Sequence, residues 1–331
     1  MIYIIILNWN GWRDTIECLE SVMALSFSEY RIVVCDNDST DDSIEKIREW
    51  IEQLPHSALY LHSAMEHPVA NPKDKFQCIN YAANKNAFPD QHHRISLIQT
   101  GENRGYGPGN NVGMEFALKD PNLKCVWILN NDVVVSPDSL QHLYAYHLEH
   151  PEAGIIGSKL MFYHQPKRIQ AIGGKYNKYF ATTRHVGEFE LDQGQYDHGG
   201  IVQQIDYPVG AALFVSKAFM ESVGLLSEDY FLYFEEIDWV SRGRHLDWQL
   251  GYCWQSVVFH KEGGATGSDA DPRLKSRLSD QYSLMNRVTF TKKFHKPWIW
   301  TVKLGLLLSG INRIRRGQWD RLGIVFKAIG S

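Results

Sequence analysis

The stretch WILNNDVVVSPDSL, Trp127–Leu140, holds a buried strand, a polar strand end and the start of a helix. Cys125–Leu129 is apolar and predicts the strand, and Ser136 with Pro137 predicts a cap for the helix that follows. Upstream, further buried strands are expected at Tyr3–Leu7, Arg31–Cys35 and Ile95–Gln99. Strands that alternate with helices predict an α/β fold with a mainly parallel, doubly wound sheet and flanking helices.

The helices of this first half are marked by apolar spacing and by capping residues. Ile16, Leu19, Val22 and Met23 share one face after the first strand. Ser39 followed by Asp42 predicts a capping box for a helix at Ser43–Gln53. A Gly-rich turn leads to a helix expected at Asn110–Leu118, and residues 54–94 lack clear periodicity.

After about residue 154 the pattern changes to shorter elements. We expect strands or hairpins at Gly154–Tyr163, Arg168–Gly173, Ile201–Asp206 and Ala211–Val215. A short helix is expected at Lys217–Val223, followed by a strand pair around Leu250–His260.

Composition excludes several classes of protein. The 331 residues are 44% hydrophobic and 22% charged, which excludes a disordered tail, a collagen-like repeat and a disulfide scaffold. The net charge of −4 gives no global basic field, so we expect no nucleic-acid partner. Five cysteines without a CxxC pair predict thiols in a reducing compartment, the cytoplasm. The opening apolar run is too short for a signal peptide, and no stretch reaches the ~18 apolar residues of a membrane span.

The C-terminal segment is the one strongly basic part of the chain. From Lys292 onward, nine Lys or Arg accompany a single acid, Asp320, and alternate with Trp298, Trp300 and Trp319. Such an amphipathic helix can lie in the headgroup layer of an anionic leaflet. Alternatively, it packs on the rest of the chain or on a second subunit.

Polar residues follow two of the expected strands directly. Asp36 and Asn37 end one strand, and Asn130, Asn131 and Asp132 end another, so both clusters should lie at the ligand-binding edge of the sheet. Asp132 could hold Mg²⁺ or Mn²⁺ together with a diphosphate. The alternative is that Asn and Asp only terminate strands and start turns.

The segment GENRGYGPGNNVG, residues 101–113, offers backbone N–H groups and Arg104 to an anion. A dinucleotide fingerprint belongs after the first strand, where NWNGW stands instead, so a dehydrogenase is disfavoured. A tight turn with a helix cap explains the glycines equally well.

The segment YFLYFEEIDWVSR, Tyr230–Arg242, places Glu235, Glu236 and Asp238 among aromatic residues. A desolvated carboxylate there could act as a general base on a sugar hydroxyl. An acidic first helical turn favoured by the helix dipole is the alternative. His260 ends a later strand, a position that is more often structural.

Seven motifs in order resemble family 2 glycosyltransferases, especially rhamnosyltransferase-like bacterial members. They are NWNG, CDNDSTDDS, ENRGYGPGNN, WILNNDVVVSPDSL, GAALFVSKAF, FLYFEEIDWVSR and VVFHKEGGATG, and the likeness runs from Ile4 to about Arg287. The resemblance implies a GT-A fold, a UDP- or dTDP-linked sugar donor, a divalent metal and inversion at the anomeric carbon. The implied acceptor is a saccharide or a lipid-linked saccharide in cell-surface polysaccharide synthesis.

The resemblance also implies roles for individual residues. Asp132 and His260 would bind the metal, Glu236 would be the catalytic base, and Asp238 and Glu235 are secondary catalytic candidates. The implied nucleotide-sugar site comprises Asn8, Asn10, Asp36, Asn37, Asn103, Arg104, Gly105, Asn110, Asn130 and Asn131. Asn130 replaces the first acid of the family's Asp-x-Asp motif, and Glu236 stands where the base is usually Asp.

We therefore expect a catalytic domain over 1–287, with a nucleotide-binding half, 1–135, and an acceptor-binding half, 136–287. A basic helical tail, 288–331, would contact the inner face of the cell membrane peripherally. Two other functions remain open: a catalytically degenerate sugar-nucleotide-binding protein and a nucleotidyltransferase.

Overall fold

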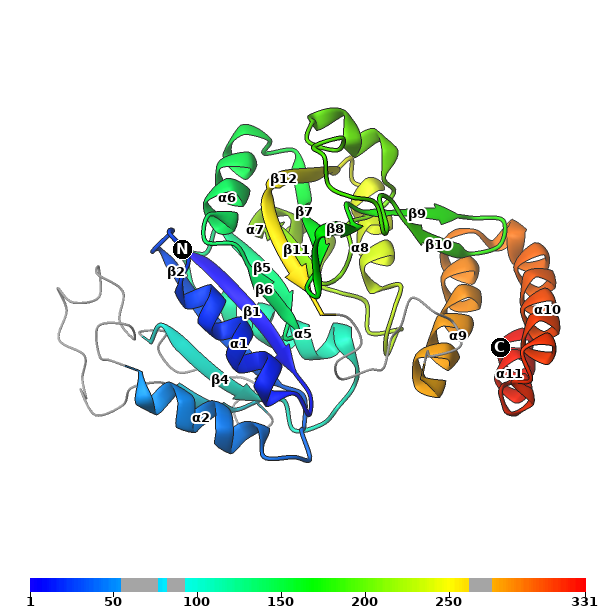
Figure 1. The fold of residues 1–331 in the computed structure, drawn as a ribbon, viewed down its shortest axis with the longest axis horizontal. Coiled ribbons are helices and arrows are strands. Elements are labelled where there is room, and N and C mark those ends of the chain that lie inside the picture. Colours follow the sequence, from blue (N-terminus) through cyan, green and yellow to red (C-terminus); the bar gives the residue numbers. More distant parts are fainter. Residues whose placement is uncertain (55–76, 82–92, 262–275) are drawn as a thin grey trace.

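A computed structural model describes residues 1–54, 77–81, 93–261 and 276–331. Its centre is one mixed sheet in the order β3-β4-β2-β1-β5-β11-β7-β12-β6, with β8 paired to β7 (Figure 1). The strands are β1 Ile2–Asn8, β2 Tyr30–Asp36, β3 Gln77–Asn80, β4 Ile95–Gln99, β5 Cys125–Asn130, β6 Val133–Val135, β7 Ala153–Phe162, β8 Gln165–Ala171, β11 Ala212–Ser216 and β12 Gln249–His260.

The first five strands of that order are parallel, as the sequence predicts. β1 pairs with β2 and β5, and β4 pairs with β2 and β3, all in parallel register. β11 then enters antiparallel between β5 and β7. The register aligns Asn8 with Asp36 and Leu7 with Asn130, so the carboxyl ends of β1, β2 and β5 meet at one edge.

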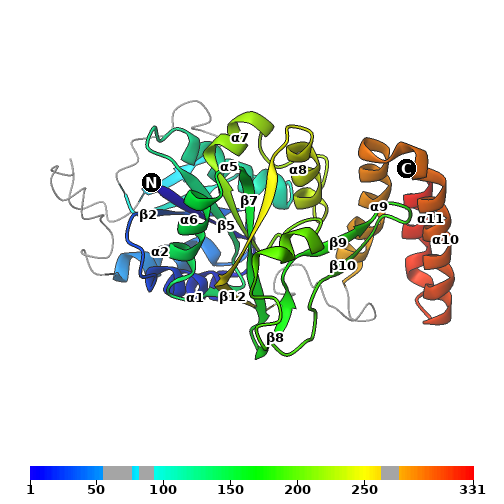
Figure 2. The same cartoon turned by 90° about the horizontal axis from the view of Figure 1, so that it is seen from above.

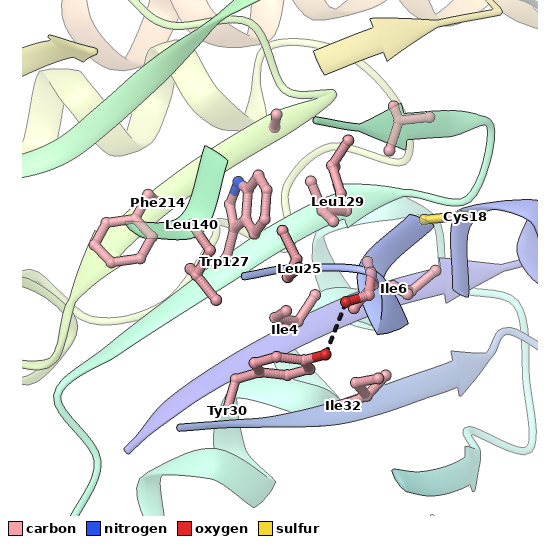
Figure 3. Packing of buried hydrophobic residues seen from close by; sticks show 14 of the residues in the cluster. Ile4, Ile6, Cys18, Leu25, Tyr30, Ile32, Trp127, Leu129, Leu140 and Phe214 are labelled. Carbon is pink, nitrogen blue, oxygen red and sulfur yellow. Dashed lines mark hydrogen bonds between the residues drawn. The ribbon is translucent and has the colours of Figure 1, made fainter. Parts of the chain in front are cut away.

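Helices cover both faces of the sheet. α1 Trp12–Met23, α2 Ser43–Gln53 and α6 Ser139–Glu149 bury their apolar residues in one cluster with β1, β2 and β5. Figure 3 shows this cluster, in which the Tyr30 hydroxyl donates to the Val22 carbonyl at 2.8 Å. α5 Tyr106–Leu118, α7 Lys217–Val223 and α8 Glu235–Arg244 pack in the cluster on the other face.

Two of the glycines in residues 101–113 serve helix packing. A Cβ on Gly109 would lie 2.6 Å from Leu7 Cδ1, and a Cβ on Gly113 would lie 2.7 Å from Ile5 Cγ2. Small residues at these positions therefore let α5 approach β1 closely. The helix begins at Tyr106, four residues before the predicted start.

The C-terminal helices form a separate cluster at one end of the molecule (Figure 2). They are α9 Arg277–Phe294, α10 Ile299–Arg315 and α11 Leu322–Gly330. The hairpin of β9 Gly174–Asn177 and β10 Thr182–His185 reaches toward them, and Tyr179 meets Trp298 edge to face at 4.5 Å between ring centroids. The boundary expected at 287/288 falls inside α9. In the described part of the chain, every helix is too short or too polar to span a bilayer.

Several local predictions are wrong. Ser39 does not cap α2, because its hydroxyl donates to Asp36 at 2.6 Å, and Asp41 accepts from the Ser43 amide at 3.0 Å instead. α6 begins at Ser139, with Asp138 rather than Ser136 at its N-cap. Ile201–Asp206 is not a strand, since a 3₁₀ turn occupies Gly199–Gln204. The expected strand pair is one long strand, β12. The predicted excursion at 54–94 lies largely outside the described residues.

Candidate active site

A cavity of about 500 Å³, here called the central cavity, opens at the carboxyl ends of β1 and β5. It is also lined from β10, from the start of α8, from the end of β12 and from α9. Of the residues predicted for the site, those that line it are Asn37, Asn103, Gly105, Asn130, Asn131, Asp132, Glu235, Glu236 and His260. The sheet edge thus brings together segments that are far apart in the sequence.

Asp132 and His260 meet at the floor of this cavity. His260 Nε2 lies 3.1 Å from Asp132 Oδ1, and both side chains are largely buried. The Lys261 amide donates to the Asp132 carbonyl at 3.0 Å, next to the pairing of β12 with β6. His260 Nδ1 lies 2.8 Å from Gln170 Oε1. The other ring nitrogen, Nε2, faces the Asp132 carboxylate.

This pair suits a divalent cation that a substrate helps to hold. Mg²⁺ and Mn²⁺ take one or two protein ligands when diphosphate oxygens and water supply the rest. Across the described ranges, no group of three or more His, Cys, Asp or Glu is arranged around a common point as a metal site. Asp132 and His260 therefore fit a cation that arrives with its diphosphate, and Gln170 would orient the imidazole.

Glu235 and Glu236 enter the cavity from an unusual helix start. Tyr233 and Phe234 both have positive φ, at 73° and 79°, so the chain turns sharply before α8. Asn286 of α9 holds this turn, since its Nδ2 donates to the carbonyls of Leu232 at 2.8 Å and Tyr233 at 2.9 Å. The aromatic-acidic segment is thus shaped by a residue more than fifty positions later.

Burial changes the proton affinity of both carboxyls. Desolvation raises the pKa of Glu236 to about 7, against a smaller lowering by hydrogen bonds and by His185. Burial, with the Glu236 charge nearby, also raises the pKa of Glu235, which is 1% exposed and has an Oε1 without a hydrogen-bond partner. Glu236 is therefore poised to gain and lose a proton near neutral pH.

Asp238 is not brought to the cavity. It is fully buried and bonded to Tyr230 at 3.0 Å, Arg242 Nε at 2.7 Å and Lys293 at 2.7 Å. These contacts tie α8 to α9, so the geometry gives Asp238 a structural position rather than that of a base.

Five residues predicted for the nucleotide-sugar site also lie beside the cavity rather than in its wall. Asn8 and Asp36 bond each other at 2.7 Å and both bond Ser39. Asn10 accepts from the Thr40 amide at 2.8 Å, and Asn110 donates to the Tyr106 carbonyl at 3.0 Å. Arg104 pairs with Glu228 at 2.5 Å and faces a neighbouring hollow of about 310 Å³.

Asn8 and Asp36 do act on the cavity indirectly, because they shape the loop that carries Asn37. Asn37 Nδ2 donates to Asn103 Oδ1 at 2.9 Å and to the Gly105 carbonyl at 3.2 Å. Gly105 has φ 103°, and a Cβ there would lie 2.2 Å from the Phe231 carbonyl oxygen. The Gly-rich loop, the end of β2 and the aromatic-acidic segment therefore lock together.

Sequence reasoning assigned no role to several residues of the cavity wall, among them Gln170, His185, Glu188 and Arg287. His185 Nδ1 lies 3.5 Å from Glu188 Oε1. Arg287 stands at the end of the family likeness, which gives it no role, although it lines the cavity and burial lowers its pKa. No sequence pattern marks Gln170, because its contact with His260 spans 90 residues.

Comparison with known proteins settles the family. The profile described as "Glycosyl transferase family 2" matches residues 3–67 and 79–198, more than half of the chain. The chain belongs to glycosyl transferase family 2. The match does not reach a subfamily, so the rhamnosyltransferase-like character stays a prediction.

This family 2 glycosyltransferase is 25% identical over 171 residues to the low-salt glycan biosynthesis hexosyltransferase Agl10 of Haloferax volcanii. The matched part covers 52% of this chain and 53% of that relative, so the chain spans about half the length of the curated protein it matches.

Two solved structures share the fold at low identity. The mannosyltransferase PcManGT of Pyrobaculum calidifontis, in complex with GDP-Man and Mn²⁺, is 12% identical with a TM-score of 0.53, over 99% of this chain and 85% of that one. GalNAc-T7 with UDP, GalNAc and Mn²⁺ is 13% identical with a TM-score of 0.59, over 90% of this chain and 49% of that one. The chain thus has a GT-A-like fold, as predicted.

Proposed function

We propose that this chain is an inverting glycosyltransferase that moves a sugar from a nucleotide-diphosphate sugar to an acceptor hydroxyl. The observation that carries the proposal is a carboxyl with pKa raised to about 7, Glu236, in the same cavity as the Asp132–His260 pair. The Glu236 carboxyl is suited to activate a hydroxyl, and the Asp132–His260 pair is suited to hold a metal-bound diphosphate.

In the proposed reaction Glu236 takes the proton of the acceptor hydroxyl. The acceptor oxygen forms a bond to the anomeric carbon from the face opposite the diphosphate. The bond from that carbon to the diphosphate oxygen breaks, and the nucleoside diphosphate leaves with the electron pair. One displacement inverts the configuration, so no protein nucleophile is needed.

The leaving diphosphate needs positive charge at the moment of transfer. A divalent cation bound by Asp132 and His260 would neutralise part of that charge. Arg287 is the better candidate for protein assistance than Arg104, because Arg287 lines the central cavity while Arg104 is paired with Glu228 outside it. Mn²⁺ in PcManGT and GalNAc-T7 supports a divalent metal here.

For the donor we propose a UDP- or dTDP-linked hexose or deoxyhexose such as rhamnose. The related hexosyltransferase and the nucleotide-sugar complexes of similar structures support the donor class. For the acceptor we propose a saccharide or lipid-linked saccharide in cell-surface polysaccharide synthesis.

We also propose peripheral contact of the C-terminal helices with the cytoplasmic face of a membrane. One side of α10 leaves large apolar residues exposed, namely Trp300, Leu304, Leu307, Leu308 and Ile311. Arg315, Arg316 and Lys327 lie exposed nearby, which suits an anionic headgroup layer.

Vesicle sedimentation tests this contact. The variant Leu304→Ser/Leu308→Ser should lose binding to anionic vesicles, whereas Leu148→Ser, which removes an exposed leucine from α6, should retain it. Equal sedimentation of both variants would overturn the membrane proposal.

Thermal stabilisation by nucleotides tests the transferase itself. UDP, dTDP, GDP and CDP are compared with and without Mg²⁺ or Mn²⁺, since a ligand of the native state raises the melting temperature. We expect UDP or dTDP to stabilise the protein only with metal, and Asp132→Ala to remove that effect. If no nucleotide stabilises the protein under any metal condition, the proposed catalytic roles fail.

A binding protein without turnover is the second candidate, favoured by Asn130 in place of an acid. Both candidates bind a sugar nucleotide, but only the enzyme releases nucleoside diphosphate when acceptor is added. Measuring that release separates them.

A further inference from the structure

Beside the central cavity lies a second hollow of about 740 Å³, here called the hairpin cleft. Its walls are the β9–β10 hairpin, the outer side of α8 and the end of α9 with His295. Thr183 of β10 and Ile237 of α8 line both hollows, so the two share a wall.

The hairpin cleft is strongly cationic. It is lined by Lys175, Lys178, Arg184 and Arg244, with His245 and His295, against a single carboxylate, Asp206. Asp206 lies 3.5 Å from Lys175 and accepts from the Tyr176 amide at 2.9 Å. Within the described ranges, Lys178, Arg184 and Arg244 form no ion pair with an acid, although the chain as a whole is acidic. Positive charge that outnumbers the acids lining a hollow favours an anionic ligand.

The apolar part of the cleft is aromatic. Tyr176 and His295 stack at 5.6 Å between ring centroids and 18° between planes, beside Phe290 and Phe294. Burial and the Lys178 charge lower the pKa of His295, which agrees with a positive potential around these rings. Aromatic faces accommodate a sugar ring, and the surrounding cations suit a phosphate.

The position of the cleft links it to the proposed reaction. Glu236 faces the central cavity from α8, while Ile237, Ser241 and Arg244 present the same helix to the hairpin cleft. A molecule whose phosphate lies among Lys178, Arg184 and Arg244 can extend past Thr183 toward Glu236. We propose that the hairpin cleft binds a phosphate group carried by the acceptor sugar, an inference that rests on the proposed transferase function.

The test compares two variants that lose the same charge. Lys178→Gln/Arg184→Gln removes two exposed cations of the cleft, and Lys119→Gln/Lys167→Gln removes two exposed cations elsewhere. Glucose 1-phosphate and inorganic phosphate are titrated calorimetrically into the full chain at low ionic strength. Because phosphate can also enter the central cavity, the comparison between the two variants decides the outcome.

We expect the cleft variant to bind glucose 1-phosphate roughly tenfold more weakly than the wild type, with the control unchanged. A second arm measures sedimentation with neutral vesicles that contain an isoprenyl phosphate, which separates a lipid-borne phosphate from a free one. Weaker binding that is seen only in the cleft variant supports the proposal. The arm in which it is seen tells whether the phosphate is free or carried by a lipid.

Equal binding by cleft variant and control in both arms overturns the proposal. Nucleotide-induced thermal stabilisation is measured on the same samples and should be unchanged by either variant. If nucleotides do not stabilise the wild type, the transferase function is in doubt. If they do stabilise it, but the cleft variant binds phosphate as tightly as the control, only the phosphate site is refuted.

Discussion

Replacing Glu236 with Gln gives the sharpest test of the proposed chemistry. The amide keeps the size and position of the side chain but cannot accept the acceptor proton at neutral pH. Loss of a general base costs typically 10²–10⁴-fold in rate, or about 3–5.5 kcal/mol in the barrier. We expect kcat to fall by that factor while nucleotide affinity, measured by thermal shift, is retained.

The raised pKa adds a second, independent signature. With a pKa of about 7, about nine-tenths of Glu236 is ionised at pH 8 and about one-tenth at pH 6. The base is therefore lost as the pH falls through 7, and kcat/KM of the wild type should drop about tenfold from pH 8 to pH 6. An ordinary carboxylate would stay ionised over this range and give a flat profile.

Initial rates of nucleoside diphosphate release, with donor and acceptor, measure both effects. Glu236→Asp keeps the acid but withdraws it by about one C–C bond, ~1.5 Å, and should retain partial activity. Glu228→Gln alters an exposed acid outside the central cavity and serves as the control. Full activity of Glu236→Gln, or a wild-type profile that is flat between pH 6 and 8, would refute the reasoning.

Three further predictions concern the wall of the cavity. Arg287→Gln should lower kcat by about 10²-fold because the leaving diphosphate loses a charged donor, and a rate equal to that of the exposed control Arg48→Gln would contradict this. Gly105→Ala should lower the free energy of unfolding by about 3 kcal/mol in urea denaturation, since φ is 103° and Cβ would meet the Phe231 carbonyl, whereas Gly199→Ala has open space and should be near neutral. Burial raises the pKa of Glu235, so the folded protein binds that proton more tightly and stability is lost as pH rises above the unfolded value. Glu235→Gln should therefore gain stability relative to the wild type between pH 5 and pH 8, and an identical pH dependence would show that Glu235 is not desolvated.

The first half of the fold could be predicted from sequence because its strands are continuous buried runs. The strand Ile95–Gln99 was predicted with the bounds that the structure has, and so was one helix of the second half, Lys217–Val223. The predicted helix cap was wrong where the side chain had a competing partner. Ser39 forms hydrogen bonds with Asp36 and Asn8 instead of with the start of α2. Local patterns do not record that competition.

Part of the candidate site could be predicted from the ends of strands, and part only from the family resemblance. Asp132 is expected at the edge that parallel strands share, whereas the resemblance implied His260 as its partner, and the structure brings the two within 3.1 Å. Gln170 and the β9–β10 hairpin were beyond prediction, because their place depends on pairings with residues far along the chain. Asp238 shows the opposite error: its acidic neighbourhood suggested chemistry, but Arg242 and Lys293 hold it in the interior.

The two hydrogen bonds from Asn286 to the turn before α8 bear on protein engineering. A shortened enzyme that ends just after the motif VVFHKEGGATG would lose α9, and a chimera with a foreign C-terminal segment would replace it. In either case the carbonyls of Leu232 and Tyr233 would lose their donor, and the left-handed turn that presents Glu236 would lose its support. Exchange of segments should therefore be made beyond Phe294, with α9 kept as part of the catalytic unit.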